Sequence, residues 1–269
     1  MSRSPTPAFQ LLAFHRDIAQ SRALVGGGVD GLILDFERRG KQARQAGFDT
    51  QINHHQHDDI TTLRNEVGGH LLCRINGPGP DMEQEIDTVL ERGVDEIIVP
   101  MIAELNDAER AVRQIGSDAA VTLMIETQQA VALAPALGSL PVKRVYVGLN
   151  DLHISRGTAS IFAPFADGVL DQVRAAISGP QFGVAGLTLP GCGDPVPVEL
   201  LFGELARIAA DFTFLRRSFY RDACDRDLAE ALVLVRQAMA QAHHRTPSEA
   251  ARQRDELVRK VTEMERARP

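Results

Sequence analysis

The feature that most constrains the fold is a regular alternation of short apolar runs with helical stretches. The runs have the length and branched residues of buried parallel strands, and they are Phe9–Phe14, Gly31–Asp35, Leu71–Ile75, Glu96–Pro100, Val121–Ile125, Val145–Gly148, Gly183–Leu187 and Phe212–Leu215. The clearest helical stretches are Ile18–Val25, Met82–Arg92, Asp107–Ile115, Val169–Ile177, Val198–Ala209 and Asp225–His243. Eight strand–helix units in 269 residues predict a (β/α)8 TIM barrel. The alternative is a doubly wound sheet, which would be wide with so many parallel strands.

Composition restricts the kind of partner. The net charge of −7 and the pI near 5.6 argue against a nucleic-acid surface. No apolar run is long enough to span a membrane, and Met1–Pro7 lacks the apolar core of a signal peptide. The three cysteines, Cys73, Cys192 and Cys224, are widely spaced and fit a reduced compartment. We therefore expect a cytoplasmic protein that binds neither nucleic acid nor membrane.

The chain divides into a barrel domain over residues 1–244 and a charged C-terminal arm over residues 245–269. In the arm, Leu257, Val261 and Met264 repeat at helical spacing and share one face of a predicted helix. A solvated helix that frays is one interpretation. We favour the other, in which this face packs on a neighbouring subunit.

Acidic residues follow two of the apolar runs. Glu126 comes directly after Val121–Ile125, and Asp151 comes shortly after Val145–Gly148. The carboxyl ends of barrel strands meet on one face, where barrels build their sites. Two carboxylates from successive strands, with waters and a substrate, form a usual open site for Mg²⁺. We therefore expect a hard divalent cation at this face.

Further polar residues are predicted on the same face, namely Asp35, Glu37, Arg74, Asn76, Thr127, Asn150 and Thr188. Carboxylates that crowd a cleft repel one another, and a bound Mg²⁺ or Mn²⁺ removes that cost. Arg74 is the arginine of this set, and we expect it to hold the carboxylate or the developing enolate oxygen of a 2-keto acid.

Structural interpretations compete with these assignments. Glu126 could cap a helix that begins at Thr127, and Asp151 could cap a short turn. Arg74 could form a structural ion pair with Asp35, which would then act behind its partner and never touch the metal.

The segment His54–Asp59 contains three histidines and invites a transition-metal interpretation. Its spacing matches no standard zinc site, so we favour a surface cluster. A proton-shuttle role for one of these histidines is a weaker alternative.

Short motifs occur along the chain in a fixed order. They are Asp35-Phe36-Glu37, Lys41-Gln42-Ala43-Arg44, Arg74-Ile75-Asn76, Asp95–Pro100, Ile125-Glu126-Thr127, and Gly148-Leu149-Asn150-Asp151-Leu152 with Gly157. This ordered set covers most of the chain and resembles the HpcH/HpaI aldolase/citrate lyase β-subunit (CitE-like) family. The resemblance implies a (β/α)8 barrel that assembles as a trimer or hexamer, with the last helix on a neighbouring subunit.

The resemblance also implies the site. Glu126 and Asp151 would bind Mg²⁺, Mn²⁺ or Co²⁺, and Arg74 would contact the keto oxygen or carboxylate of the substrate. Backbone N–H groups at Gly148, Leu149 and Asn150 would bind the substrate carboxylate. The family's chemistry is reversible carbon–carbon cleavage through a pyruvate-like or acyl enolate.

Two departures from the family pattern bear on the chemistry. Arg38 stands where the aldolase branch has histidine and the citrate-lyase branch has aspartate, so the general acid or base is open. We expect Asp35 or Glu37 to position a water or proton carrier. Arg216 and Arg217 form a basic segment that matches neither branch and could bind an extra carboxylate or phosphate, or bridge subunits.

Three functions follow from these residues. The leading hypothesis is a metal-dependent lyase or aldolase acting on a 2-keto acid of the pyruvate or oxaloacetate type. The first alternative is a Claisen enzyme, like citrate synthase or malyl/citramalyl-CoA lyase, that uses an acyl thioester of coenzyme A. The second alternative is a ligand-binding barrel without catalysis, which Arg38 motivates.

Overall fold

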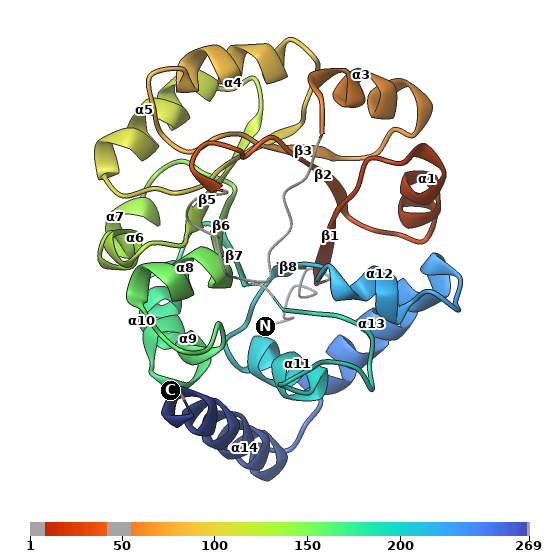
Figure 1. Cartoon of the computed structure of the whole chain (residues 1–269), viewed down its shortest axis with the longest axis vertical. Helices are drawn as coiled ribbons and strands as arrows, with labels where there is room; N and C mark the ends of the chain where they lie inside the picture. The colour runs from red at the N-terminus through yellow and green to blue at the C-terminus, as the bar shows by residue number, and fades with distance from the viewer. Residues whose placement is uncertain (1–8, 42–54, 185, 268–269) are drawn as a thin grey trace, which may run out of the picture.

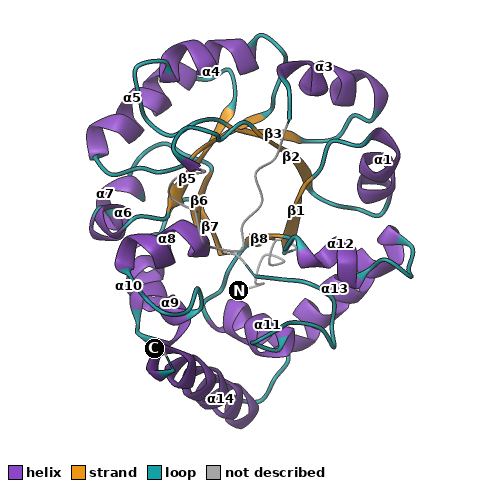
Figure 2. Cartoon of the chain, viewed as in Figure 1, coloured by secondary structure: helices purple, strands orange, loops and turns teal. Residues whose placement is uncertain are grey.

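The computed structural model describes residues 9–41, 55–184 and 186–267. Parallel strands close into a barrel in chain order, with β8 pairing back to β1, and helices surround it (Figures 1 and 2). The strands are β1 (Gln10–Phe14), β2 (Gly31–Asp35), β3 (Leu71–Arg74), β4 (Glu96–Val99), β5 (Ala120–Ile125), β6 (Arg144–Val147), β7 (Gln181–Val184) and β8 (Phe212–Phe214). The predicted (β/α)8 barrel is confirmed, and the doubly wound alternative is wrong.

The predicted helices also occur, with ends that differ by a few residues. The helices are α1 (Ile18–Gly26), α3 (His57–Glu66), α4 (Met82–Leu90), α5 (Leu105–Ile115), α6 (Gln128–Ala132), α7 (Ala134–Leu137), α8 (Leu149–Arg156), α9 (Ala163–Ala166), α10 (Val169–Ala176), α11 (Val198–Arg207), α12 (Ser218–Asp222), α13 (Leu228–His243) and α14 (Pro247–Arg266). Helix α13 begins later than predicted because Asp227 accepts the N–H groups of Ala229 and Glu230 and so caps it. None of the helices in these described ranges is long and apolar enough to cross a membrane.

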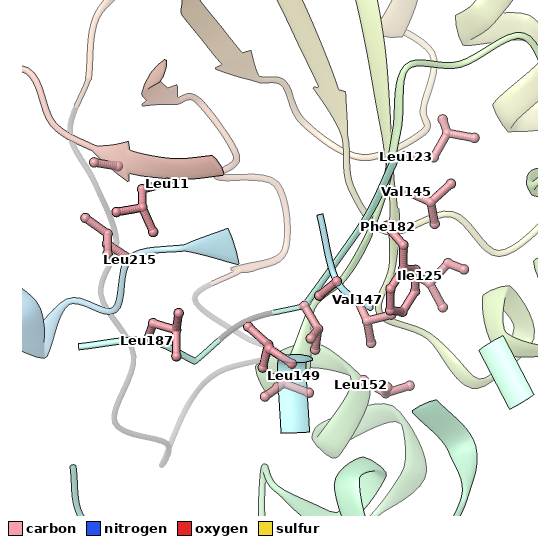
Figure 3. Close-up of a cluster of buried hydrophobic side chains, with 14 of the residues drawn as sticks. Leu11, Leu123, Ile125, Val145, Val147, Leu149, Leu152, Phe182, Leu187 and Leu215 are labelled. Carbon is pink, nitrogen blue, oxygen red and sulfur yellow. The ribbon is translucent and has the colours of Figure 1, made fainter. Parts of the chain in front are cut away.

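Side chains alternate between the inside and the outside of the barrel. The inward set fills the interior as one cluster, made of Leu12, Ile33, Leu72, Ile98, Met124, Tyr146, Phe212 and Phe214. Outward residues of β5 to β7 pack together under the helices, as Figure 3 shows for Leu123, Ile125, Val145, Val147 and Phe182. Gly183 is inward, and a Cβ there would lie 2.5 Å from the Phe212 ring, so this ring fills the space. The same alternation turns charged residues inward at both ends of the barrel.

The amino-terminal end of the barrel holds a buried ionic cluster around Glu96. Arg144 donates to one Glu96 carboxylate oxygen and Thr122 to the other, while His70 Nε2 lies 2.8 Å from Oε2. Arg144 also donates to Gln10 Oε1 at 2.8 Å. Burial by itself raises the pKa of Glu96, but the contacts with His70, Arg144 and Thr122 outweigh it and lower that pKa to about 2.

Helix α14 packs against α9 and α11 of its own chain (Figure 1). Leu257 and Val261 are buried in this contact, and Met264 is partly buried. Near the end of the helix, the Glu265 carboxylate accepts the backbone N–H groups of Ala159 at 3.1 Å and Ser160 at 2.6 Å. The apolar face that led us to expect a subunit contact is therefore used within the chain. Packing on a second subunit stays a prediction.

Candidate functional site

A cavity of about 1050 Å³ opens at the carboxyl ends of the strands. Its lining includes six of the predicted site residues, which are Arg74, Glu126, Gly148, Leu149, Asn150 and Asp151. Asp35 and Glu37 are not part of the lining, and each is only 1% exposed. The predicted residues thus fall into a group that faces the cavity and a pair that supports it from behind.

Arg74 is held from behind by Asp35. Its Nε and Nη2 donate to the two oxygens of Asp35 at 2.9 and 2.8 Å. Such a two-point contact fixes the plane of the guanidinium. The group also lies over the Phe14 ring, 5.0 Å from its centroid. The ion pair with Asp35 that we considered as an alternative is therefore present, and it orients an arginine that still faces the cavity.

Lys41 completes this support. Its Nζ lies 3.2 Å from Asp35 Oδ2 and 3.3 Å from Glu37 Oε2, while Arg74 Nη1 lies 3.4 Å from Glu37 Oε2. Lys41 is 4% exposed and reaches the cavity lining. Asp35 and Glu37 therefore hold two cations at the cavity wall and do not reach into the cavity themselves.

Glu126 follows β5 and points into the barrel mouth. Capping is not its role, because the Thr127 hydroxyl accepts the Ala130 N–H at 2.9 Å and caps α6. Instead Glu126 Oε1 accepts the Met101 N–H at 2.8 Å. Met101 has a φ of 56°, which is strained for a side chain of this size. The structure thus places a strained backbone donor where it orients Glu126, a feature that the sequence did not indicate.

The surroundings of Glu126 disfavour its charged form. Burial, and then the negative charges of Glu37 and Asp151, raise its pKa to about 8, although Arg74 and the Met101 N–H oppose the shift. At Gly148, a Cβ would lie 2.6 Å from Glu126 Oε2, so glycine leaves space beside the carboxylate. A carboxylate pair with adjacent space and an excess of negative potential fits a hard divalent cation.

The donor set for such a cation is small. Across the described ranges, no group of three or more histidine, cysteine, aspartate or glutamate side chains could hold a metal. Glu126 and Asp151 would therefore supply two ligands, and water or substrate oxygens would supply the others. That composition is typical of open magnesium sites and not of structural zinc sites.

Helix α8 begins at the cavity wall beside this pair. Gly148 is its N-cap residue, and Asp151 lies in its first turn. The Gly148 N–H donates to Ile125 O at 3.1 Å, so it is engaged in the sheet and does not offer itself to a substrate. The next N–H groups, at Leu149 and Asn150, belong to the first helical turn, where no intrahelical acceptor exists. Both residues line the cavity.

The histidine segment and Arg38 differ in their position, because His55 lines the cavity and Arg38 does not. His55 Nδ1 accepts the Asp35 N–H at 2.8 Å, and burial lowers the pKa of His55 to about 4. The His57 ring packs at a tilt against Phe36 with 4.7 Å between ring centroids, and His54 is outside the described residues. Arg38 donates to the carbonyl of His55 and is not part of the cavity lining.

Two residues that the sequence did not single out also line the cavity, His15 after β1 and Tyr220 on α12. Their rings stack with 5.1 Å between centroids. Arg216 and Arg217, which follow β8, join them in the lining. The pairing of β1 with β8 brings these segments together, although most of the chain separates them in sequence.

Comparisons with known proteins bear on the fold. No protein-family model matches the sequence, and no curated protein matches it either. Solved structures do match, including an HpcH/HpaI aldolase from Desulfitobacterium hafniense DCB-2, with a TM-score of 0.61 and 13% identity over 81% of this chain and 90% of that one. The chain has the fold of these aldolases. The fold implied by the sequence resemblance is thereby confirmed.

Two further structures agree with this result. An HpcH/HpaI aldolase/citrate lyase family protein from Burkholderia cenocepacia J2315 has a TM-score of 0.60 and 15% identity, covering 87% of this chain and 94% of that one. The citrate synthase SbnG has a TM-score of 0.60 and 15% identity, covering 82% and 91%. At these identities the comparison concerns the arrangement of the chain, and the chemistry must be argued from the site.

Proposed function

We propose that the chain is a divalent-metal-dependent carbon–carbon lyase or aldolase that acts through the enolate of a 2-keto acid, of the pyruvate or oxaloacetate type. One observation carries the proposal: a buried carboxylate with a raised pKa, Glu126, shares a cavity with a guanidinium that Asp35 fixes, Arg74. A purely structural role does not explain a carboxylate buried among carboxylates. The ordered motifs and the shared fold support the same conclusion.

Glu126 and Asp151 would bind Mg²⁺, Mn²⁺ or Co²⁺. When bound, the ion would supply Lewis-acid polarisation of the keto group and charge compensation for the enolate. Arg74 would meet the enolate oxygen from the side of β3. A guanidinium has five N–H bonds, and its contacts with Asp35 and Glu37 leave two for a substrate oxygen, as far as the described residues are concerned.

The remaining groups would position the substrate and its proton. The N–H groups of Leu149 and Asn150 would hold the substrate carboxylate at the start of α8. Asp35 and Glu37 would act as positioning residues, since they touch Arg74 and Lys41 and do not line the cavity. The Lys41 ammonium, which does line it, is then the group beside Arg74 that can orient a water or proton carrier.

The acyl-thioester alternative has one observation in its favour. The cavity is larger than pyruvate requires, and Arg216, Arg217 and Arg221 form part of its wall. A coenzyme A thioester carries phosphates that arginines bind. Condensation of acetyl-CoA with oxaloacetate by the purified protein would favour this alternative over an aldolase.

The proposal is tested by pyruvate enolisation, followed as exchange of the methyl protons in D₂O, and by oxaloacetate decarboxylation. Each assay is run with EDTA, Mg²⁺, Mn²⁺ and Co²⁺. We expect metal-dependent turnover that is lost in Glu126→Gln and Arg74→Ala and retained in Glu91→Gln, an exposed acid away from the cavity. Absence of turnover with every metal and with acetyl-CoA would contradict the proposal and favour the non-catalytic barrel.

A homo-oligomer, trimer or hexamer, belongs to the proposal as well. Light scattering of the purified protein tests it directly. A monomer at micromolar concentration would contradict this part and leave the catalytic part standing.

A further inference from the structure

The floor of the cavity is a platform of three aromatic rings inside the barrel. The Arg74 guanidinium lies over the Phe14 ring, 5.0 Å from its centroid, and Phe14 meets the Phe214 ring edge-on at 5.5 Å. Phe214 in turn stacks on Tyr146, with 3.7 Å between the ring centroids and 17° between the ring planes. All four residues line the cavity. Tyr146 brings a hydroxyl to this platform, and the proposed enolate chemistry has so far given it no role.

Tyr146 lies one inward position deeper in the barrel than the proposed metal site. It pairs with Met124 in the register of β5 and β6, and both side chains belong to the interior cluster. Because side chains alternate along a strand, the next inward positions are those of Glu126 and Gly148, two residues further on. The phenol therefore belongs to the layer just below the Glu126 carboxylate.

Two charged residues of the proposed site act on the phenol. Burial raises the pKa of Tyr146 well above its ordinary value, and the negative charge of Glu126 adds to this shift. The positive charge of Arg74 and a backbone contact with Phe214 oppose it. Arg74 and Glu126 are therefore both near enough to influence the hydroxyl. At neutral pH this phenol stays protonated, so it can donate a hydrogen bond but cannot serve as a base.

The hydrogen of this hydroxyl finds no acceptor within the parts of the chain that the structure describes. The Phe214 backbone contact lowers the pKa, so it is made to the phenol oxygen and leaves the hydrogen unused. Tyr220, the other tyrosine of the chain, differs because its hydroxyl donates to Phe14 O at 3.0 Å. A buried O–H without an acceptor is unfavourable unless a ligand supplies an oxygen.

We propose that the Tyr146 hydroxyl donates a hydrogen bond to the enolate oxygen alongside Arg74, and so is a further catalytic residue. This inference rests on the proposed function. When the substrate's C3 loses a proton, the C–H electron pair forms the C=C bond and the carbonyl π pair moves onto oxygen. Tyr146 keeps its own proton and stabilises the new charge by hydrogen bonding. A neutral phenol does this without a counter-ion, whereas Arg74 is held by Asp35.

The catalytic test removes one hydroxyl at a time. Tyr146→Phe keeps the ring and the platform, and Tyr220→Phe is the matched control from the same cavity lining. Both are compared with wild type in proton exchange of pyruvate in D₂O with Mg²⁺. We expect Tyr146→Phe to lower kcat by about 10²-fold with little change in KM, because the hydroxyl acts on charge that develops after binding. Tyr220→Phe should match wild type per folded molecule.

Thermal unfolding distinguishes this loss from a structural one. Tyr146→Phe should not lower the Tm, since it removes a hydroxyl whose hydrogen has no acceptor, whereas Tyr220→Phe loses a hydrogen bond and should lower it. Wild-type exchange rates in Tyr146→Phe, or equal losses of kcat in the two variants, would overturn the inference. Absence of exchange in the wild type with every metal would instead count against the proposed function.

A spectroscopic test needs no turnover. The chain has no tryptophan and two tyrosines, so Tyr220→Phe leaves Tyr146 as its single tyrosine in near-ultraviolet absorption. Oxalate resembles the enolate of pyruvate in shape and charge. With Mg²⁺ it should raise the Tm of this variant and shift the tyrosine absorption to longer wavelength, because the phenol then donates to an anion.

The two readouts of this titration separate the claims. A rise in Tm without a shift of the tyrosine absorption would overturn the role of Tyr146 and leave the proposed site standing. A shift in a protein that does not exchange the protons of pyruvate would support the contact while the proposed function fails. No effect of oxalate on either readout would count against both.

Discussion

Each end of the barrel holds a buried glutamate, and the surroundings of these two glutamates shift their pKa values in opposite directions. At the amino-terminal end, Glu96 accepts from Arg144, Thr122 and His70, and these contacts lower its pKa to about 2. At the carboxyl end, burial and neighbouring carboxylates raise the pKa of Glu126 to about 8. Both residues are inward, buried glutamates at strand ends. They differ in their neighbours, because hydrogen-bond donors and cations surround Glu96, whereas carboxylates lie near Glu126.

The difference teaches how to distinguish a structural charge from a functional one. A glutamate surrounded by donors is stabilised as an anion and contributes to folding. One that is surrounded by acids is unfavourable in the folded protein and makes sense only with a cation or a reaction. This agrees with the general division of barrels, in which the amino-terminal face serves stability and the carboxyl face serves chemistry.

The largest expected effect is on catalysis at the carboxyl end. Glu126→Gln should lower metal-dependent enolisation by on the order of 10³-fold, because it removes a charged group at the reacting centre. Stability should not fall, since the amide removes a carboxylate that the folded state disfavours. Proton exchange of pyruvate and thermal unfolding in EDTA measure the two effects. A Glu126→Gln variant that is stable and fully active would contradict a functional role for Glu126 and with it the difference between the two ends.

The next effect is on stability at the opposite end. Arg144→Met leaves Glu96 buried without its main cation and should lower the free energy of unfolding by about 3–5 kcal/mol. Denaturant titration measures it. The double variant Glu96→Leu/Arg144→Met should recover most of the loss. Enolisation per folded molecule should stay near wild type, and a selective loss of activity would show that the ends are coupled.

Acidic pH should weaken the contribution of Glu96 to the free energy of unfolding. The folded-state pKa of Glu96, about 2, lies below its ordinary value of 4.5, so its stabilisation is complete above pH 4.5 and is lost as the pH falls towards 2. The difference in unfolding free energy between wild type and Glu96→Gln should shrink by about 3 kcal/mol across that range. Denaturant titrations at each pH measure the difference. A constant difference would mean that Glu96 is not held as an anion.

The smallest effect concerns the arm that supports the carboxyl end. Thr246 caps α14 by accepting the Glu249 N–H at 3.3 Å, and Glu249 accepts the Thr246 N–H at 2.8 Å in return. Thr246→Ala should lower the free energy of unfolding by about 1 kcal/mol. Thr262→Ala, near the C-terminal end of the same helix, is the control and should be neutral. An equal loss in both variants would argue against a specific capping effect.

Much of the fold could be predicted because short branched runs and helical stretches alternate so regularly. Local pattern placed Glu126 and Asp151 at strand ends, and the structure brings both to one cavity. The sequence pattern did not predict that Asp35 and Glu37 lie behind Arg74. Their carboxylates form ion pairs with Arg74 and Lys41 and do not reach the cavity. Whether an inward carboxylate reaches the cavity depends on the cations of other elements, and one strand does not contain that information.

Other features required closure of the barrel. The Glu96–Arg144 pair joins β4 to β6, and two opposite charges in the inward phase of buried strands were a signal that could have found it. The positive φ of Met101 could not be predicted from the sequence, because methionine does not favour this backbone conformation. His15 and Tyr220 stack in the cavity lining because β8 pairs with β1, so this contact joins residues separated by most of the chain.

Helix α14 has a consequence for how such a protein changes over time. Glu265 holds the backbone at Ala159 and Ser160, and Phe162 follows shortly and lies beneath Arg216. The final helix therefore reaches the cavity, and its Met264 is part of the lining. Mutations in this tail are therefore a route by which descendants of the chain could reshape the cavity without changing Arg74, Glu126 or Asp151. For the same reason, laboratory evolution of the cavity's shape should begin in the twenty residues that form this helix.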